Sequence, residues 1–364
     1  MFDTYAFSRV NRNQYEKFGA ITEFLTCYDL DVDADVERFV VAKSQGQIIA
    51  CGGLAGSTLK SIAIDPALQG TGFSLRLMTE LTTMAYEMGR FDLFLFTKPQ
   101  NMQRFRDSGF FPISFADDKL VLMENSQTNL RNLVRSLRKK KKEGDKIGSI
   151  VMNANPFTLG HQYLIETAAS QCDWLHLFVV SEEGKGFAYH DRLNMIESGT
   201  KHIPNLTIHH GSKYIISKAT FPTYFIKEKR LIDYCHTAID LNLYRQHIAP
   251  ALGITHRFVG TEPDCVVTQY YNQQMKHRLT TKDLNGAPIS VIEIERKCAS
   301  GTTISASGTT ISASGTTISA STVRKLLQTG QLDQLVHFLP STSIDYLQRH
   351  TDALPCLTQE TVAA

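Results

Sequence analysis

The chain has 364 residues, enough for two domains, and its hydrophobic fraction of 42% is that of a globular protein with a buried core. The formal net charge of +2 at pH 7 excludes nucleic-acid binding by bulk electrostatic attraction, and no apolar run approaches the roughly 18 residues that span a membrane. Seven cysteines without C-x-x-C spacing argue against a zinc knuckle, and together with an N-terminus that has no signal-peptide core they predict a soluble, cytoplasmic protein.

The N-terminal part of the chain is predicted to contain a hairpin and a strand-turn-helix unit. β-Rich runs at Phe39–Ala42 and Ile48–Leu54 flank Ser44–Gln47, which is typical of a hairpin. A third strand, Leu59–Ile64, leads into the glycine-containing turn Gln69–Ser74 and then into an amphipathic helix. A strand, a glycine turn and a helix in this order favour phosphate binding at the helix start.

The hairpin and the turn resemble the acyl-CoA loop of the GNAT acetyltransferases, whose pattern is Q/R-x-x-G-x-G/A. Gln69 and Gly72 match this pattern, whereas Ser74 stands where the family has Gly or Ala. The resemblance implies that the loop, with Gln69, Gly70 and Gly72, holds the pyrophosphate of a CoA-like group through backbone N–H groups. The alternative is an ordinary glycine turn inside an α/β domain.

Downstream, Asn101–Phe110 resembles the N…Y…GF segment of the same family, with one departure. The family often uses a tyrosine near this segment as the general acid for the leaving thiolate, but this chain has Phe105, which has no proton to donate. We therefore expect this domain to bind a CoA-like group without transferring acetyl by itself.

Residues 129–146 are predicted to form a basic helical linker, because Arg138–Lys142 is an unbroken run of positive charges. Such a run suits contact with an anionic partner such as an acidic carrier protein. A solvated connector between two domains is the interpretation we favour.

A βαβ unit is predicted after the linker. Ile147–Met152 is an apolar, β-branched strand, Asn153–Phe157 is a proline-containing loop, and a helix begins near Gly160. A second apolar strand, Trp174–Val180, follows the helix. Ligands of such units bind at the carboxyl ends of the strands, and the free N–H groups of the helix start suit a phosphate.

The tetrad at that helix start, Thr158-Leu159-Gly160-His161, resembles the T/H-x-G-H motif of the nucleotidyltransferase superfamily. The resemblance implies that Thr158 and His161 are the catalytic contacts to the α-phosphate of ATP, with Asn155 and Gly160 in the same binding site. The alternative is a helix N-terminus that happens to contain a threonine and a histidine.

Further candidate site residues lie downstream of this tetrad. Arg192 opens a helix at a place where the superfamily often has a phosphate-binding arginine, and the alternative is an arginine on the helix surface. Glu262 follows the strand end Arg257–Gly260, so it either faces the same crevice or is a loop carboxylate in water. Metal ligation is not expected of three histidines that lack ligand spacing, His190, His209 and His210.

Residues 301–321 repeat the heptad GTTISAS three times in succession. One strong apolar residue and a glycine in each heptad cannot form a coiled-coil seam, and short polar repeats are usually flexible. The last copy runs into a predicted helix with Ser321 as its N-cap and Gly330 at its end. The first two copies are interpreted as a tandem expansion, and deletion of residues 301–314 is expected to be tolerated.

The end of the repeat, Ile318-Ser319-Ala320-Ser321-Thr322-Val323-Arg324, resembles the I-S-S/T-T-x-x-R motif of the nucleotidyltransferase superfamily. The resemblance implies that Ser319, Ser321 and Arg324 hold the β- and γ-phosphates of ATP. A chain that carries both motifs in this order points to the superfamily more specifically than a chain that carries either one.

Together these features resemble the citrate lyase ligases. The resemblance implies a GNAT-like α+β domain at 1–128, a linker at 129–146, a Rossmann-like parallel-sheet nucleotidyltransferase domain at 147–350 and a tail at 351–364. It also implies use of ATP with Mg²⁺, and acetate as the attacking group, which gives acetyl-adenylate and diphosphate. The implied partner is the acyl carrier (gamma) subunit of citrate lyase, whose phosphoribosyl-dephospho-CoA thiol takes the acetyl group as AMP leaves.

Two other functions stay open. An adenylyltransferase acting on pantetheine phosphate would use the same two motifs and would be indifferent to acetate. A regulatory module that senses acyl-CoA and nucleotide would use both domains for binding alone. ATP–pyrophosphate exchange, measured with and without acetate, separates these three functions.

Overall fold

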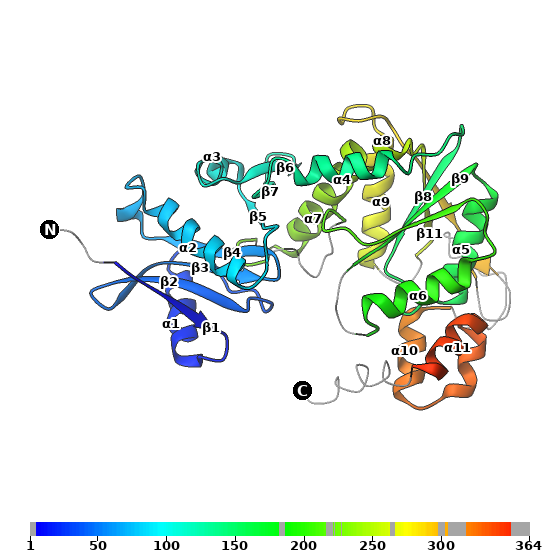
Figure 1. Ribbon diagram of the computed structural model, residues 1–364, viewed down its shortest axis with the longest axis horizontal. Helices are drawn as coiled ribbons and strands as arrows, with labels where there is room; N and C mark the ends of the chain where they lie inside the picture. The colour runs from blue at the N-terminus through cyan, green and yellow to red at the C-terminus, as the bar shows by residue number, and fades with distance from the viewer. Residues whose placement is uncertain are drawn as a thin grey trace. The chain divides into compact units, whose positions relative to one another are not determined.

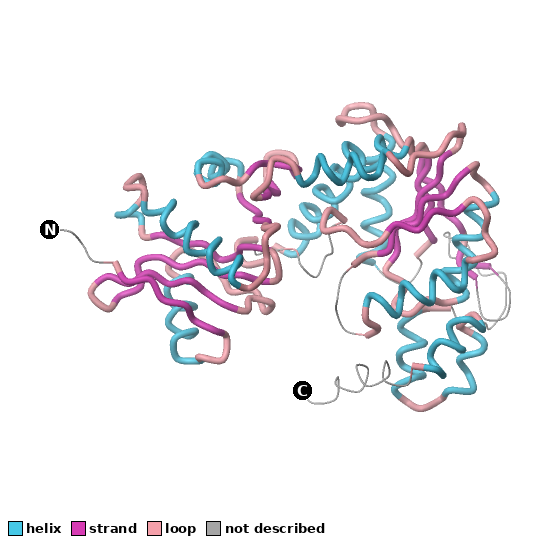
Figure 2. Tube along the Cα trace, in the orientation of Figure 1, coloured by secondary structure: helices cyan, strands magenta, loops and turns pink. Residues whose placement is uncertain are grey.

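The computed structural model describes residues 5–181, 186–215, 221, 223–226, 228–262, 266–297, 303–304 and 318–350 (Figure 1). Most of the GTTISAS repeat lies outside the described residues. The chain divides into two compact units, Met1–Arg135 with Lys218–Leu243, and Ser136–Ser217 with Tyr244–Ala364. Each unit combines helices with a β-sheet, which confirms the predicted α/β class (Figure 2).

The first unit contains a seven-stranded mixed sheet in the order β1-β2-β3-β4-β5-β7-β6. Its strands pair antiparallel except β4 and β5, which are parallel. The predicted hairpin is β2 and β3, and its two-residue turn places Gln45 and Gly46 at φ 49° and 82°, as tight hairpins require. The strands are β1 (Ala6–Asn11), β2 (Arg38–Ser44), β3 (Gln47–Ala55), β4 (Thr58–Ile64), β5 (Phe94–Thr97), β6 (Phe111–Ala116) and β7 (Leu120–Glu124).

The core of this unit forms where helix α2 (Phe73–Glu87) packs on the sheet. Its buried face carries the apolar side chains that the helical spacing predicts, among them Leu77 and Leu81. A Cβ atom built on Gly52 of β3 would lie 2.5 Å from Leu81 Cδ1, so a larger residue here would force the Leu81 side chain to move. The other helices of the unit are α1 (Tyr15–Thr26), α3 (Met102–Asp107) and α7 (Lys229–Leu243).

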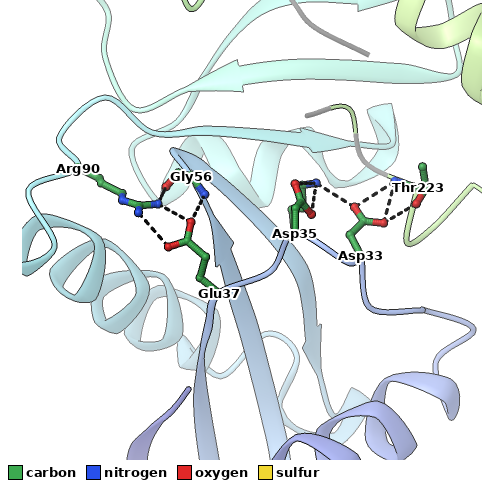
Figure 3. Close-up of polar contacts among 7 residues, drawn as sticks. Asp33, Asp35, Glu37, Gly56, Arg90 and Thr223 are labelled. Atoms are coloured by element: carbon green, nitrogen blue, oxygen red, sulfur yellow. Dashed lines mark hydrogen bonds and ion pairs between the residues drawn. The ribbon is translucent and has the colours of Figure 1, made fainter. Parts of the chain in front are cut away.

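A late segment of the chain returns to the first unit. The fully buried ammonium of Lys60 on β4 pairs with Asp33 at 3.0 Å and with Asp35 at 2.8 Å. Asp33 in turn accepts a hydrogen bond of 3.1 Å from the backbone N–H of Thr223 (Figure 3). The predicted boundaries place residues 218–243 in the second domain, whereas helix α7 (Lys229–Leu243), within this range, packs against β6 and β7 of the first unit.

The second unit contains a five-stranded, fully parallel sheet in the order β10-β9-β8-β11-β12, which confirms the Rossmann-like prediction. The strand order reverses between β8 and β11, and ligands of open α/β sheets bind at such a switch point. The strands are β8 (Ile147–Met152), β9 (Trp174–Val179), β10 (Leu206–His209), β11 (His256–Gly260) and β12 (Ser290–Ile294), and a short antiparallel pair follows, β13 (Arg296–Lys297) and β14 (Thr303–Ile304).

Two contacts from the C-terminal helices fix the loop between β8 and α5 (Leu159–Ser170). The hydroxyl of Ser343 on α11 (Ser341–Arg349) donates to the carbonyl of Phe157 at 3.2 Å, and the N–H of Leu159 donates to the carbonyl of Phe338 at 2.9 Å. The remaining helices are α4 (Asn129–Arg138), α6 (Tyr189–Thr200), α8 (Ala249–Leu252), α9 (Val266–Thr280) and α10 (Ala320–Gln328). Among the described residues, no helix has the length and apolar character needed to cross a membrane.

Candidate active site

A cavity of about 730 Å³ lies in the second unit at the carboxyl ends of three parallel strands. Met152, Gly260 and Ile294, at the ends of β8, β11 and β12, contribute to its wall. The first residues of helices α5 and α10 line the same cavity. The two helix starts give the cavity a positive potential, and the N–H groups of their first turns that lie in its wall offer hydrogen-bond donors for an anion.

Thr158 and His161 cap the start of α5 reciprocally. The hydroxyl of Thr158 accepts a 3.4 Å hydrogen bond from the backbone N–H of His161, and Nδ1 of His161 accepts a 3.1 Å hydrogen bond from the backbone N–H of Thr158. An imidazole that accepts at Nδ1 carries its proton at Nε2 when it is neutral. The cap therefore leaves His161 with one N–H available for a ligand in the cavity.

His161 stays neutral at physiological pH. Removal from water, with a smaller contribution from the positive charge of Arg296, lowers the pKa of its imidazole to about 4. The Phe157 ring stacks against the imidazole with centroids 6.1 Å apart. A neutral hydrogen-bond donor at this place suits an oxygen of a phosphoryl group that gains charge during reaction.

Helix α10, the second helix that begins at the cavity, has its N-cap two residues earlier than predicted. Ser319, with φ −131° and ψ 148°, is the N-cap, and its hydroxyl accepts a 3.1 Å hydrogen bond from the backbone N–H of Thr322. The prediction that Ser321 is the N-cap is therefore wrong: Ile318 is buried in the core, and the helix already begins at Ala320. Ser321 lies in the first turn, is exposed, and lines the cavity.

The two helix starts approach each other closely. A Cβ atom built on Gly160 would lie 3.5 Å from both Cγ2 and the carbonyl oxygen of Ile318. Arg324, one turn into α10, donates through Nη1 to the carbonyl of Asn155 at 2.5 Å and also lines the cavity. The structure thus brings both sequence motifs to one cavity, with Thr158, Gly160, His161, Ser319, Ser321 and Arg324 in its wall.

The structure does not bring Asn155 and Arg192 to the cavity wall. Asn155 connects the loop after β8 to the segment before α6, because its Oδ1 accepts a 2.9 Å hydrogen bond from the N–H of Phe187. Arg192 is completely buried, and its Nη1 donates to the carbonyls of Asn153 at 2.7 Å and of Val180 at 3.0 Å. Its guanidinium therefore ties together the loops that follow β8 and β9.

Arg296 belongs to no motif and was not predicted, and the sequence left open whether Glu262 faces the crevice or water. Both side chains line the cavity, and the guanidinium of Arg296 forms an ion pair with the largely buried carboxylate of Glu262. The available signal was the change from the apolar run of β12 to the charged residues directly after it, at the carboxyl end of a parallel strand.

A separate cavity of about 620 Å³ lies in the first unit. The predicted loop residues Gln69, Gly70 and Gly72 line it, and Gly70 and Gly72 have φ values of 80° and 78°, which favour glycine. Gly72 is the N-cap of α2, so the first N–H groups of that helix are available there. Phe105 lies in the wall, at the place where the resemblance predicts a tyrosine.

Curated relatives match nearly the whole chain. It is 47% identical to the citrate (pro-3S)-lyase ligase of Escherichia coli (strain K12) over 348 residues, which are 96% of this chain and 95% of the relative. It is 49% identical to the enzyme of the same name from Klebsiella pneumoniae, over 91% of this chain and 92% of the relative. A family model described as the citrate lyase ligase C-terminal domain matches residues 147–313 and 309–347.

More distant similarities cover parts of the chain. A phosphopantetheine adenylyltransferase from Staphylococcus saprophyticus is 38% identical over 64 residues, 17% of this chain and 40% of the relative. The crystal structure of Escherichia coli ElaA covers 33% of this chain and 99% of that chain, with 14% identity and a TM-score of 0.31. An acyl-CoA N-acyltransferase from Pseudomonas aeruginosa covers 34% of this chain and 100% of that chain, with 14% identity and a TM-score of 0.30.

Proposed function

The chain belongs to the citrate lyase ligase family, and from this we propose that it uses ATP to acetylate the thiol of the CoA-like arm on the acyl carrier subunit of citrate lyase. The observation that carries the proposal is the meeting of the T-L-G-H and I-S-A-S-T-V-R motifs at one cavity. Two helix starts and an arginine around one cavity match the several charges of a nucleoside triphosphate.

In the first step an oxygen of acetate forms a bond to the α-phosphorus of ATP, and the bond from that phosphorus to the bridging oxygen breaks. Pyrophosphate leaves with the electron pair, and the product is acetyl-adenylate. The attacking group is already an anion, so the step requires alignment and charge neutralisation and no general base. The Nε2–H of His161 donates to an α-phosphate oxygen as charge builds on it. The hydroxyl of Thr158 lies 2.9 Å from Nδ1 of His161 and donates there, so Thr158 acts by fixing the orientation of the imidazole.

Ser319, Ser321 and Arg324 hold the β- and γ-phosphates as pyrophosphate departs. Ser321 has an exposed hydroxyl, the first turn of α10 has N–H groups, and Arg324 has a planar fork of donors, all of which bind phosphate oxygens in this proposal. Asn155 and Arg192 act as positioning residues, since they hold the loops that carry these contacts.

Mg²⁺ would be held mainly by the phosphates of ATP itself, and it would help to neutralise their charge. Glu295 is exposed in the cavity wall and is one carboxylate that would hold such an ion through water.

In the second step the carrier thiol, as thiolate, attacks the acetyl carbonyl carbon of the mixed anhydride. The thioester bond forms, the bond from the carbonyl to the phosphate oxygen breaks, and AMP leaves. The cavity of the first unit supports a role for that unit in holding the CoA-like arm, because the Gln69–Gly72 loop and the α2 start offer N–H donors for its pyrophosphate. Phe105 fits binding without acid catalysis by this unit. This chemistry uses reduced thiols and ATP, and we assign it to the cytoplasm.

The experiment that tests the proposal is ATP–pyrophosphate exchange by the full chain, with and without acetate. Exchange that requires acetate is expected. Exchange that ignores acetate and requires pantetheine phosphate would identify an adenylyltransferase of the kind that matches 64 residues here. ATP binding without exchange under any carboxylate would identify a nucleotide-sensing module.

A further inference from the structure

The side chain of Arg296 is held in the cavity wall with part of its guanidinium unused. Its Nη2 donates to Oε2 of Glu262, and its backbone N–H donates to the hydroxyl of Thr261 at 3.3 Å. Within the part of the chain that the structure describes, Nε and Nη1 of Arg296 make no hydrogen bond. The side chain of Arg296 is 28% exposed and that of Glu262 only 9%, so the carboxylate anchors the guanidinium and the remaining donors face accessible space.

We propose that Arg296, anchored by Glu262, binds the carboxylate of the acyl substrate. This inference rests on the proposed adenylation and adds the carboxylate subsite to it. The parallel pair available on Arg296 is an N–H of Nη1 with the second N–H of Nη2, since Glu262 takes only one donor of Nη2. Two such donors match the two oxygens of a carboxylate, which makes arginine the side chain best suited to this ligand.

The charge balance of the wall favours a carboxylate over another phosphate. Glu262 offsets most of the charge of Arg296, and Glu295 adds a second negative charge to the wall. A nearly neutral Arg–Glu pair attracts a polyphosphate only weakly, whereas it still presents directed donors to a monoanion. The helix starts and Arg324 already provide for the phosphates, so Arg296 is left for the second substrate.

The position of Arg296 also suits attack on the α-phosphate. Arg296 and His161 line the same cavity, and the positive charge of Arg296 contributes to the lowered pKa of His161. A carboxylate on Arg296 therefore shares the cavity with the phosphoryl group that His161 contacts. Ile294 and Val259 line the same cavity and offer an apolar surface to the methyl group of acetate.

The test is a comparison of Arg296→Gln and Arg296→Lys with the wild-type full chain in acetate-dependent ATP–pyrophosphate exchange. The Gln variant is expected to raise the KM for acetate by roughly tenfold or more, because hydrogen bonds between ionised groups are about twice as strong as neutral ones. The KM for ATP should change far less. The Lys variant keeps the charge and loses the fork, so an intermediate KM for acetate is expected. Arg324→Gln is the matched control, and it is expected to raise the KM for ATP far more than the KM for acetate.

A rise in the KM for ATP without a rise for acetate, in either Arg296 variant, would overturn the inference and assign Arg296 to the nucleotide. An unchanged KM for both substrates would also overturn it. Neither result is confused with failure of the proposed function, because that failure would appear as exchange without acetate dependence in the wild-type chain itself.

Discussion

The backbone N–H of Thr158 donates a hydrogen bond to Nδ1 of His161 across 3.1 Å. Because this contact makes Nδ1 an acceptor, Nε2 is the imidazole nitrogen whose N–H is available to a ligand. Burial, with a contribution from the charge of Arg296, lowers the pKa of His161 to about 4, so the ring is neutral and its remaining proton is on Nε2. The side chain that caps the helix is thus also the proposed donor for the α-phosphate.

Replacement of His161 by Ala is expected to lower the rate of acetate-dependent ATP–pyrophosphate exchange about 10²–10³-fold, the effect of removing one oxyanion donor. The cause is loss of the Nε2–H contact as charge builds on the α-phosphate. The measurement is kcat for exchange, with urea unfolding as the control for loss of the cap. Near-normal exchange by a folded His161→Ala chain would remove this residue from the chemistry.

Replacement of Arg192 by Met is expected to destabilise the second unit by about 3 kcal/mol or more, because each buried carbonyl left without a donor costs roughly 1–3 kcal/mol. The guanidinium holds the carbonyls of Asn153, Val180 and Phe187. Thermal and urea unfolding measure the effect. Unchanged stability combined with a large rise in the KM for ATP would return Arg192 to the phosphate site that the sequence predicted.

Ser319 and Ser321 form a matched pair, because both belong to the proposed phosphate site and only Ser319 also caps helix α10. Ser319→Ala removes the N-cap of α10 and is expected to cost about 1 kcal/mol of stability. Ser321→Ala alters an exposed hydroxyl and is expected to change stability by less than about 0.5 kcal/mol, while it raises the KM for ATP. Equal stability losses in the two variants, or no change in the KM of Ser321→Ala, would contradict these roles.

The buried pair His176 and His209 makes the stability of the second unit depend on pH. Their ring nitrogens lie 3.0 Å apart, and burial lowers the two pKa values to about 4 and about 3. The unfolded chain binds these protons below about pH 6.5 and the folded chain does not, so their contribution is complete above pH 6.5 and is lost as the pH falls toward 4. Urea unfolding at pH 7.5 and pH 5 should show the loss.

The control for that measurement is the double variant His176→Gln with His209→Gln, which has no proton to gain at this place. Its unfolding free energy should fall less steeply between pH 7.5 and pH 5 than that of the wild-type chain. Parallel pH curves for the two proteins would show that other groups cause the dependence.

Deletion of residues 308–314, the middle copy of the GTTISAS heptad, is expected to leave acetate-dependent exchange intact. Halving the length of a connection changes its closure free energy by only about 0.6 kcal/mol. The longer deletion, 301–314, also removes Thr303 and Ile304, whose backbone pairs with Lys297 and Arg296. The sequence alone predicts that the longer deletion is tolerated, but because of this pairing we expect it to raise the KM for acetate. Loss of exchange in the shorter deletion would refute the interpretation as tandem expansion.

Local pattern was sufficient for the elements and motifs of the site. The apolar strand Ile147–Met152, the helix start at Thr158 and the I-S-x-S-x-x-R segment depend on residues adjacent in the chain, because strand burial, capping chemistry and helix periodicity act over a few residues. The parallel sheet follows from the βαβ order, which places strand ends at one edge.

Tertiary packing decided what each polar side chain touches. Arg192 had the sequence context of a phosphate ligand, yet it is enclosed where three carbonyls need a donor. Arg296 carried no motif and reaches the cavity because β12 ends beside β11, where Glu262 meets it. Burial and donor-acceptor pairing arise between segments far apart in the chain. The sequence alone therefore determined the fold and the two motifs, and only the tertiary structure decided which charged groups line the cavity.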